Sequence, residues 1–490
     1  MNYTEIQAAK NNSAIPFCKN FSLHSKYNPE REAAQFAATI LDGRFFVVLG
    51  LAGGYHIRAI HERFSCAKIV AIEQTTEDIS FLKKIPEVSK LICENWLKIF
   101  TIDEIQEELK KSYRPALDGN LTIIPLRAWA SAFPDAEKKA KEKIKIALEE
   151  ISADFSVQSH FGNIWQKNIF LNLKLSEKTT DANERLSKIP FEKTAAIVAA
   201  GPSLNETIKK IEENREKYYV VATDTAFRAL NARKIFSDAV VSVDGQLVSC
   251  AHFLQSLSKK TLFVFDLCAN HCAAARAVKV GASVIFAQTG HPLSQYANKQ
   301  NSFIPLFAGS GTVTIAAAHF AILAGFKKIE FFGADFSYNL APYTRGTYLD
   351  AQFSLNESRF FPRETAFDSL MFRTELQPQK NGTKTTKILL SYEKSLLDFM
   401  KNMGFSAEKN EKTKIFSSKT NSPNFPKINQ FNFKKFTEYY RRKLQNFNEN
   451  EESEELMTLL PLTAWVKSHN GNESPLIIAY NKTIGYTNKL

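Results

Sequence analysis

The sequence predicts an α/β protein in which a Rossmann-like N-terminal domain precedes a central doubly wound domain and a C-terminal helical region. Two observations lead to this prediction. Short apolar runs alternate with helical segments between residues 193 and 335, which is the pattern of a largely parallel sheet covered on both faces. A strand, a glycine-rich turn, a helix and a second strand also follow one another at 44–73, as in nucleotide-binding folds.

Length and composition exclude several classes of protein. The chain has 490 residues, of which 44% are hydrophobic and 23% charged, unlike disordered chains, collagen-like fibres or coiled-coil rods. At roughly 150 residues per domain this length predicts two to four domains. No apolar run reaches about 18 residues, so no transmembrane segment is expected. Six cysteines are too few for a disulfide scaffold and no secretory signal opens the sequence, which predicts a soluble cytoplasmic protein.

The charge balance does not indicate nucleic acid as a partner. Lysine and arginine number 63 against 51 aspartates and glutamates, a net charge of +12. The basic residues are spread along the chain, and no nucleic-acid recognition motif accompanies them. We interpret the excess as a solubility feature and expect no nucleic-acid partner.

The N-terminal domain is assigned to residues 1–150. Its first strand is predicted at 45–49 and is followed by the turn GLAGG at 50–54, a helix, and a second strand that ends on Glu73. Glycines let a ligand approach the backbone, and a terminal acid can accept hydrogen bonds from a ribose. The spacing departs from G-x-G-x-x-G. We therefore favour a scaffold that binds nothing at this turn, with a bound cofactor as the alternative.

A helical connector is predicted at 151–190. An amphipathic stretch leads into it from Glu137, and a second helical stretch carries Trp165 together with Asn168 and Asn172, four residues apart. We interpret the two asparagines as helix surface polarity, with hydrogen bonds across a domain seam as the alternative. Pro190 closes the segment.

The central domain is assigned to residues 191–380 and contains the main functional signal. Strands are predicted at 195–199, 218–222, 239–243, 262–265, 283–286 and 329–332. Ligands of doubly wound sheets bind at the carboxyl ends of the strands. Ser203, Asp224, Asp244 and Asp335 all follow such ends, so we expect them to line a site. The region 381–490 is predicted to be helical at 388–403, 433–445 and 454–467, with a polar linker at 409–432.

Three stretches in order, 197–204, 220–244 and 309–338, resemble a known family. They are similar to the bacterial motility accessory factors, the Maf flagellin glycosyltransferases, which are grouped with the MptE-like 6-hydroxymethylpterin diphosphokinases. The glycine turn at 50–56 and the helix at 165–173 also resemble that family's N-terminal domain and connector.

The resemblance implies a sialyltransferase-like central domain. It further implies transfer of a nonulosonic acid, of pseudaminic or legionaminic type, from a CMP-sugar donor to Ser or Thr hydroxyls of flagellin, as needed for filament assembly and motility. The sequence does not specify the sugar, the acceptor positions, a divalent metal or the oligomeric state.

The chemistry of the residues at the strand ends is compatible with this implied activity. Amides of the turn that opens a helix can hold a phosphate or a cytidine carbonyl, and Thr223 or Asp224 can bond a ribose or base. Tyr338 and Tyr343 stand where bacterial sialyltransferases place two tyrosines on the donor phosphate. The donor-nucleotide candidates are Gly201, Pro202, Ser203, Leu204, Thr223, Asp224, Ser310, Gly311 and Arg345. The catalytic candidates are Asp244, Asp335, Tyr338 and Tyr343.

The catalytic base is not identified by this comparison. The sialyltransferases carry a histidine base after the tyrosines, whereas this chain has no histidine between His319 and His469. Carboxylates of near-neutral pKa can replace it. The candidates are Asp244, Asp335 and Asp350, with His291 as an outsider. Loop packing for the tyrosines and a turn cap for Asp335 are the structural alternatives.

Other readings of the sequence stay open. The segment CANHC at 268–272, with Cys250 and His252, has zinc-ligand residue types but no four-ligand spacing, so we interpret it as structural. A second function is Mg²⁺-dependent pyrophosphoryl transfer from ATP to a pterin alcohol, with Asp244 and Asp335 as metal ligands. A third is a non-catalytic flagellar assembly factor.

Overall fold

The computed structural model describes residues 2–19, 21–179, 181–309, 311–379, 382–408, 413–447, 453–469 and 474–489. The chain divides into two units, Met1–Gly162 with Leu460–Ile478, and Asn163–Leu459 with Ala479–Leu490. Three helices contain the boundaries between the units. They are α8 (Pro134–Ser176), α19 (Glu454–His469) and α20 (Pro475–Lys489).

The first unit is built on a four-stranded parallel sheet of order β6-β5-β4-β7. Its strands are β4 (Phe45–Leu49), β5 (Lys68–Glu73), β6 (Leu97–Thr101) and β7 (Leu121–Pro125). All five residues of β4 are buried, as expected for a parallel strand covered on both faces. The predicted strand–turn–helix–strand order at 44–73 is thus confirmed.

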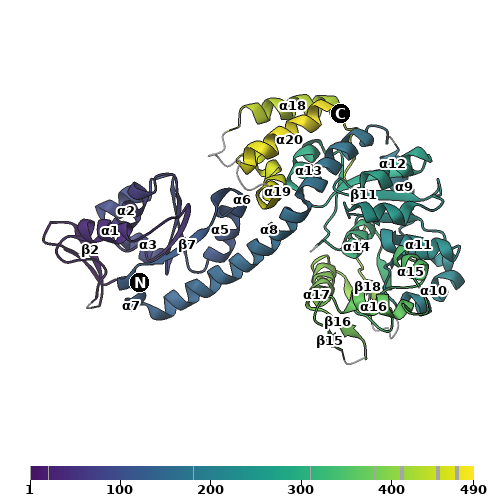
Figure 1. The fold of residues 1–490 in the computed structure, drawn as a ribbon, viewed down its shortest axis with the longest axis horizontal. Coiled ribbons are helices and arrows are strands. Elements are labelled where there is room, and N and C mark those ends of the chain that lie inside the picture. Colours follow the sequence, from purple (N-terminus) through teal and green to yellow (C-terminus); the bar gives the residue numbers. More distant parts are fainter. Residues whose placement is uncertain are drawn as a thin grey trace. The chain divides into compact units, whose positions relative to one another are not determined.

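The first unit also contains a small antiparallel sheet and several short helices (Figure 1). An antiparallel sheet comprises β1 (Glu5–Ala8), β2 (Ala14–Cys18) and β3 (Phe21–Ser22). The helices are α1 (Pro29–Ala38), α2 (Tyr55–Arg63), α3 (Thr76–Leu82), α4 (Pro86–Leu91), α5 (Ile105–Ser112), α6 (Pro115–Asp118) and α7 (Arg127–Ala132).

The second unit contains a sheet of order β13-β12-β11-β10-β9-β8-β14-β18-β17. The strands from β13 to β14 in this order pair in parallel, which confirms the predicted doubly wound sheet. They are β8 (Thr194–Val198), β9 (Tyr218–Thr223), β10 (Ala239–Ser242), β11 (Leu262–Asp266), β12 (Ser283–Gln288), β13 (Ile304–Pro305) and β14 (Lys328–Phe332).

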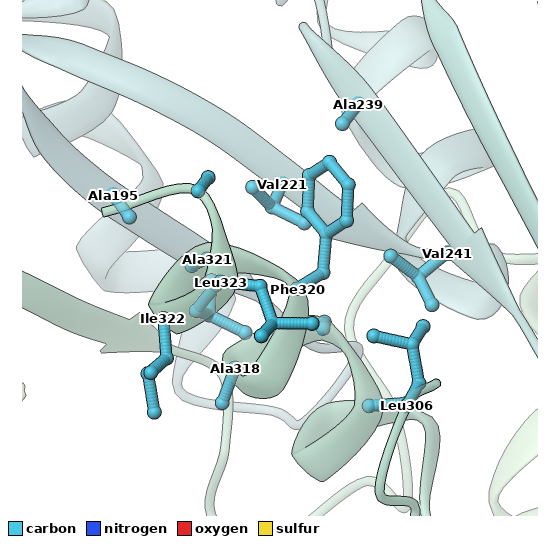
Figure 2. Packing of buried hydrophobic residues seen from close by; sticks show 14 of the residues in the cluster. Ala195, Val221, Ala239, Val241, Leu306, Ala318, Phe320, Ala321, Ile322 and Leu323 are labelled. Atoms are coloured by element: carbon cyan, nitrogen blue, oxygen red, sulfur yellow. The ribbon is translucent and has the colours of Figure 1, made fainter. Parts of the chain in front are cut away.

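Helices cover both faces of this parallel sheet. On one face α14 (Val313–Leu323) is buried almost throughout, because its apolar side chains extend all round the helix. Figure 2 shows Phe320 directed from α14 toward Val221 and Ala239. The opposite face is covered in part by Phe253, whose ring contacts Phe263 and Phe265.

The remaining elements of the second unit are mostly helical (Figure 1). Those before β14 are α9 (Ala182–Ser187), α10 (Leu204–Glu213), η1 (Arg215–Lys217), α11 (Asp224–Ala232), η2 (Leu247–Phe253), α12 (His271–Lys279), α13 (Pro292–Ala297) and η3 (Asn298–Gln300). Those after it are α15 (Tyr348–Leu355), α16 (Arg363–Met371), the hairpin β15 (Gln377–Pro378) and β16 (Lys384–Thr385), α17 (Lys387–Asn402) and α18 (Phe433–Gln445).

The sequence prediction for the C-terminal region needs one correction. Strands β17 (Ser406–Glu408) and β18 (Lys414–Ser417) extend the central sheet, although we expected helices and a polar linker there. Strand β18 pairs antiparallel with β14 and covers an edge that would otherwise expose unpaired backbone groups. A four-residue strand stabilised by its neighbour leaves little signal in the surrounding polar sequence.

Candidate functional site

The order of the strands creates a topological switch point between β8 and β14. From β8 the chain proceeds through β9 to β13 on one side, and it returns to the other side as β14. In open α/β sheets the crevice at such a point, at the carboxyl ends of the strands, is where ligands bind. Segment 201–204 follows β8, and Asp335 follows β14.

These two strand ends are joined by hydrogen bonds. The main-chain nitrogen of Ser203 donates to Oδ2 of Asp335 at 2.8 Å, and the Ser203 hydroxyl donates to Oδ1. The nitrogen of Gly201 donates to the Gly333 carbonyl at 2.8 Å. A Cβ on Gly201 would lie 2.4 Å from that carbonyl oxygen, so only glycine allows this approach. The turn-cap alternative for Asp335 is therefore present in the structure.

These contacts change the expected role of the 200–204 turn. The amides of Gly201 and Ser203 donate to the β14 end, and the amide of Leu204 donates to the Gly201 carbonyl. Pro202 has no amide hydrogen to donate. Three of the amides expected to hold a phosphate, those of Gly201, Ser203 and Leu204, therefore donate to acceptors of the chain itself. Burial raises the pKa of Asp335, while its hydrogen bonds from Ser203 lower it.

Asn205 fastens the loop that carries the two tyrosines. Its Oδ1 accepts hydrogen bonds from the Thr344 hydroxyl at 2.8 Å and from the Arg345 amide at 3.1 Å. The Thr344 amide donates to the Ala200 carbonyl at 2.9 Å. The loop after β14 is therefore bound to the turn after β8. Sequence reasoning missed Asn205, because nothing local to it indicates a partner so far along the chain.

Tyr338 and Tyr343 lie near each other in this loop. The backbone of Tyr338 pairs with Lys384, and both tyrosines are half-buried. Burial raises the pKa of both phenols, the phenol of Tyr338 further raises that of Tyr343, and Arg373 opposes this. Both hydroxyls are therefore protonated hydrogen-bond donors at neutral pH. Arg373, which no motif indicated, is a cation whose charge lowers the pKa of the Tyr343 phenol, and Arg345 is exposed.

The candidates after β9 have partners inside the chain. Thr223 caps α11 by accepting a hydrogen bond from the Ala226 amide at 3.3 Å. The carboxylate of Asp224 accepts from the Ser242 hydroxyl at 2.7 Å and from the Thr225 amide at 2.7 Å. Asp224 is 2% exposed, and burial raises its pKa. Neither side chain presents an open edge to a ribose.

The remaining predicted site residues differ in whether contacts within the chain already occupy them. Asp244 accepts from the Gln246 amide at 3.0 Å and from the Ser249 hydroxyl at 2.5 Å. Among the described residues, no atom lies within 4 Å of a Cβ built on Gly311, so the space there is open. Ser310 lies outside the described residues.

From the sequence, Asn168 and Asn172 of α8 are interpreted as polar residues on a helix surface, and the structure shows that this interpretation is wrong. Asn168 is 7% exposed and Asn172 is fully buried. Nδ2 of Asn168 donates to the carbonyls of Gly245 and Cys268, both at 3.0 Å. Nδ2 of Asn172 donates to those of Leu267 and Ala269, at 3.0 and 2.9 Å. The two amides therefore satisfy main-chain carbonyls after β10 and β11 within the second unit.

The glycine turn of the first unit is filled by the protein's own side chains. Glu73 is fully buried, and its carboxylate accepts hydrogen bonds from the Tyr3 hydroxyl at 2.7 Å and from Nε1 of Trp129 at 2.9 Å. A Cβ on Gly50 would lie 2.5 Å from the Trp129 ring. The Glu73 carboxylate, which could otherwise bind a ribose, is thus hydrogen-bonded to Tyr3 and Trp129. This favours the interpretation of the first unit as a scaffold that binds nothing at the turn.

In the part of the chain that the structure describes, no group of three or more His, Cys, Asp or Glu side chains is placed to hold a metal ion. The cysteines at 250, 268 and 272 are free thiols. None of the described helices combines the length and apolarity needed to cross a bilayer.

Comparison with known proteins places the chain in a family. A family model described as 6-hydroxymethylpterin diphosphokinase MptE-like matches residues 167–340. An uncharacterized protein of Treponema pallidum (strain Nichols) is 36% identical over 157 residues, which are 32% of this chain and 73% of that protein. A second from the same organism is 32% identical over 229 residues, 46% of this chain and 74% of that protein. The chain belongs to the MptE-like family.

A solved structure has the same fold as this MptE-like protein. The Maf glycosyltransferase from Magnetospirillum magneticum AMB-1 aligns with a TM-score of 0.56 and 12% sequence identity, over 99% of this chain and 86% of that chain. At this identity the likeness concerns the fold. It extends beyond the 167–340 segment that matches the MptE-like model.

Proposed function

We propose that this MptE-like protein is a glycosyltransferase. It moves a nonulosonic acid, of pseudaminic or legionaminic type, from a CMP-sugar to Ser or Thr hydroxyls of flagellin. The observation that carries the proposal is the placement of Tyr338 and Tyr343, two protonated phenols in a loop fastened to the switch point, with the charge of Arg373 acting on the Tyr343 phenol. The shared fold with a Maf glycosyltransferase supports it. Flagellin as acceptor rests on the family resemblance.

The chemistry of the donor fits these side chains. When a CMP-sugar loses its sugar, negative charge develops on the phosphate oxygen that leaves. Hydroxyl and guanidinium donors aimed at that oxygen stabilise the transition state more than the ground state. Tyr338 and Tyr343 take this role in the proposal, and Arg373 and Arg345 supply positive charge. The open space at Gly311 suits close approach of the nucleotide.

We also propose a role for each part of the chain. Residues 191–380 form the catalytic domain, 1–150 a Rossmann-like scaffold, 151–190 the connector and 381–490 the C-terminal region. The reaction takes place in the cytoplasm, on flagellin that has not yet been exported. In this arrangement CMP binds at the β8–β14 switch point rather than at the glycine turn after β4.

The description of the matching family model favours one alternative, pyrophosphoryl transfer from ATP to a pterin alcohol. That reaction needs Mg²⁺ held by carboxylates and phosphates. Asp244 and Asp335 are the carboxylates at the strand ends, and each already accepts two hydrogen bonds from the chain. Both carboxylates thus have structural roles within the chain, and among the described residues no group of three or more His, Cys, Asp or Glu side chains is placed to hold a metal ion. We therefore favour the glycosyl transfer.

One experiment separates the two functions. The purified full chain is incubated with flagellin and either CMP-pseudaminic acid or CMP-legionaminic acid, and flagellin is analysed by intact mass. Parallel reactions contain ATP, Mg²⁺ and 6-hydroxymethylpterin. A mass increase of one nonulosonic acid supports the proposal, whereas formation of the pterin diphosphate with unmodified flagellin rejects it. Thermal shifts with CMP, ATP and S-adenosylmethionine identify the bound nucleotide independently.

A further inference from the structure

His252 stands out among the buried side chains that the proposed function does not use. It lies in η2, the short helix that follows β10, and is 9% exposed. Across the described residues its Nδ1 finds no hydrogen-bond partner and is buried. Its ring meets that of Tyr348 edge to face, with centroids 6.0 Å apart. Tyr348 opens α15 directly after the loop that carries the two tyrosines.

Charged groups from two neighbouring elements face this imidazole. Asp224 and Arg228 come from α11, and Asp244 follows β10. Burial lowers the pKa of His252, the two aspartates oppose this, and Arg228 adds to the lowering. The ring is therefore neutral near pH 7 and can accept a proton, while the aspartates would stabilise the imidazolium that results.

An unpartnered buried nitrogen is costly. A buried polar atom without a partner destabilises the folded state, because it has lost its hydrogen bonds to water without gaining others. Such atoms are rare in native proteins, and a catalytic role is one of the explanations they call for. Nδ1 is the buried nitrogen without a partner, whereas Nε2 is not among such atoms, so we take Nε2 as the nitrogen that meets the substrate.

The other candidates for the base are already engaged. Asp244, Asp335 and Asp350 each accept at least two hydrogen bonds from the chain. In His291, Nδ1 accepts from the Leu293 amide at 3.1 Å. Its Nε2 is buried and meets no partner in the described part of the chain. Neither nitrogen of His291 is therefore placed to reach a substrate.

We infer that His252 is the general base of the transfer, an inference that rests on the proposed function. The acceptor oxygen bonds to the anomeric carbon of the donor, and the hydroxyl proton moves to Nε2 of His252. The bond from the anomeric carbon to the leaving phosphate oxygen breaks, and its electron pair stays on that oxygen, so CMP departs. The imidazolium then returns the proton to water.

The test uses the full chain with CMP-pseudaminic acid and flagellin. Replacing a general base lowers turnover by roughly 100-fold or more, so His252→Gln should lose that much while the KM for the donor stays near the wild-type value. Added imidazole should restore part of the turnover of His252→Ala. A purely structural histidine would show no such rescue.

The pH profile of the wild-type protein gives a second measurement that needs no variant. Turnover should fall as the pH drops below the pKa of His252, because the protonated ring cannot accept the hydroxyl proton. A wild-type profile without this acid limb overturns the inference.

A matched control keeps the two proposals distinguishable. His271→Gln alters another histidine of the same unit, whose Nδ1 lies 3.0 Å from Oδ1 of Asn172, and it should retain turnover. If the wild-type protein transfers the sugar and a folded His252→Gln protein does so equally well, only the base is wrongly assigned. If the wild-type protein transfers no sugar, the proposed function fails and the base assignment fails with it.

Discussion

Ser203 donates two hydrogen bonds to the carboxylate of Asp335, one from its main-chain nitrogen at 2.8 Å and one from its hydroxyl. The two residues follow neighbouring strands but lie 132 positions apart in the sequence. Their contact joins the ends of β8 and β14 at the switch point.

Gly201→Ala should destabilise the second unit. Its Cβ would lie 2.4 Å from the Gly333 carbonyl oxygen and 2.5 Å from Oδ2 of Asp335. Forcing such an overlap costs typically about 1–3 kcal/mol, measurable as a lower midpoint in thermal unfolding. Gly485→Ala is the control, since within the described chain a Cβ there meets nothing within 4 Å. A Gly201→Ala protein as stable as wild type would contradict the observed approach of the two strand ends.

Tyr338→Phe and Tyr343→Phe should each lower turnover strongly and weaken CMP binding only modestly. Removing one donor from a developing oxyanion costs about 3 kcal/mol of barrier, a rate loss of roughly 100-fold or more. Because the two phenols act on one phosphate, the double variant should lose less than the product of the single losses. Single-turnover kinetics and calorimetry with CMP measure the two effects. Near wild-type flagellin modification by the folded double variant would show that the tyrosines only pack the loop.

Asn172→Ala should destabilise the second unit, because its amide satisfies the carbonyls of Leu267 and Ala269. Leaving buried carbonyls without a donor costs about 1–3 kcal/mol, and urea unfolding of the full chain measures the loss. Lys167→Ala, an exposed residue on the same helix, should stay within about 0.5 kcal/mol of wild type. Equal effects of the two substitutions would argue against the docking role of Asn172.

Glu73→Gln should change how stability depends on pH. Burial raises the pKa of Glu73, and the hydrogen bonds from Tyr3 and Trp129 lower it only in part. The folded protein therefore holds this proton more tightly than the unfolded chain, in which a glutamate titrates near about 4.3. The glutamate's contribution to the free energy of unfolding is thus fully present below that pH and falls as the pH rises toward the folded pKa.

The difference in unfolding free energy, wild type minus Glu73→Gln, should accordingly be largest below about pH 4 and decrease toward pH 7. Denaturant unfolding at several pH values measures it. Glu77→Gln is the control with the opposite sign, because hydrogen bonds with its own main chain lower the pKa of the exposed Glu77. A difference that grows with pH for Glu73→Gln would show that its carboxyl is not desolvated as described.

The order of most strands of the central sheet could be predicted from the sequence by itself. Apolar runs such as 195–199 and 218–222 became the parallel strands β8 and β9, because the signal for a buried strand lies within the strand itself. The turns that follow these strands, and the placement of Ser203 and Asp335 at the carboxyl edge, followed from the same pattern. The resemblance of segments 197–204 and 309–338 indicated the family before any contact was known.

Only the tertiary structure decided which of these side chains already have hydrogen-bond partners within the chain. Asp244 accepts hydrogen bonds from its near neighbours Gln246 and Ser249. Asp224 and Asp335 also follow strand ends, but Ser242 and Ser203, which donate to them, come from other segments of the chain. The same holds for Glu73, which Tyr3 and Trp129 saturate from 70 and 56 positions away. Local composition carries no record of such partners, because hydrogen bonding and desolvation depend on which distant segments meet. The carboxylates that the sequence offered as bases are therefore occupied, and a histidine in a short helix without a motif is the group left to accept a proton.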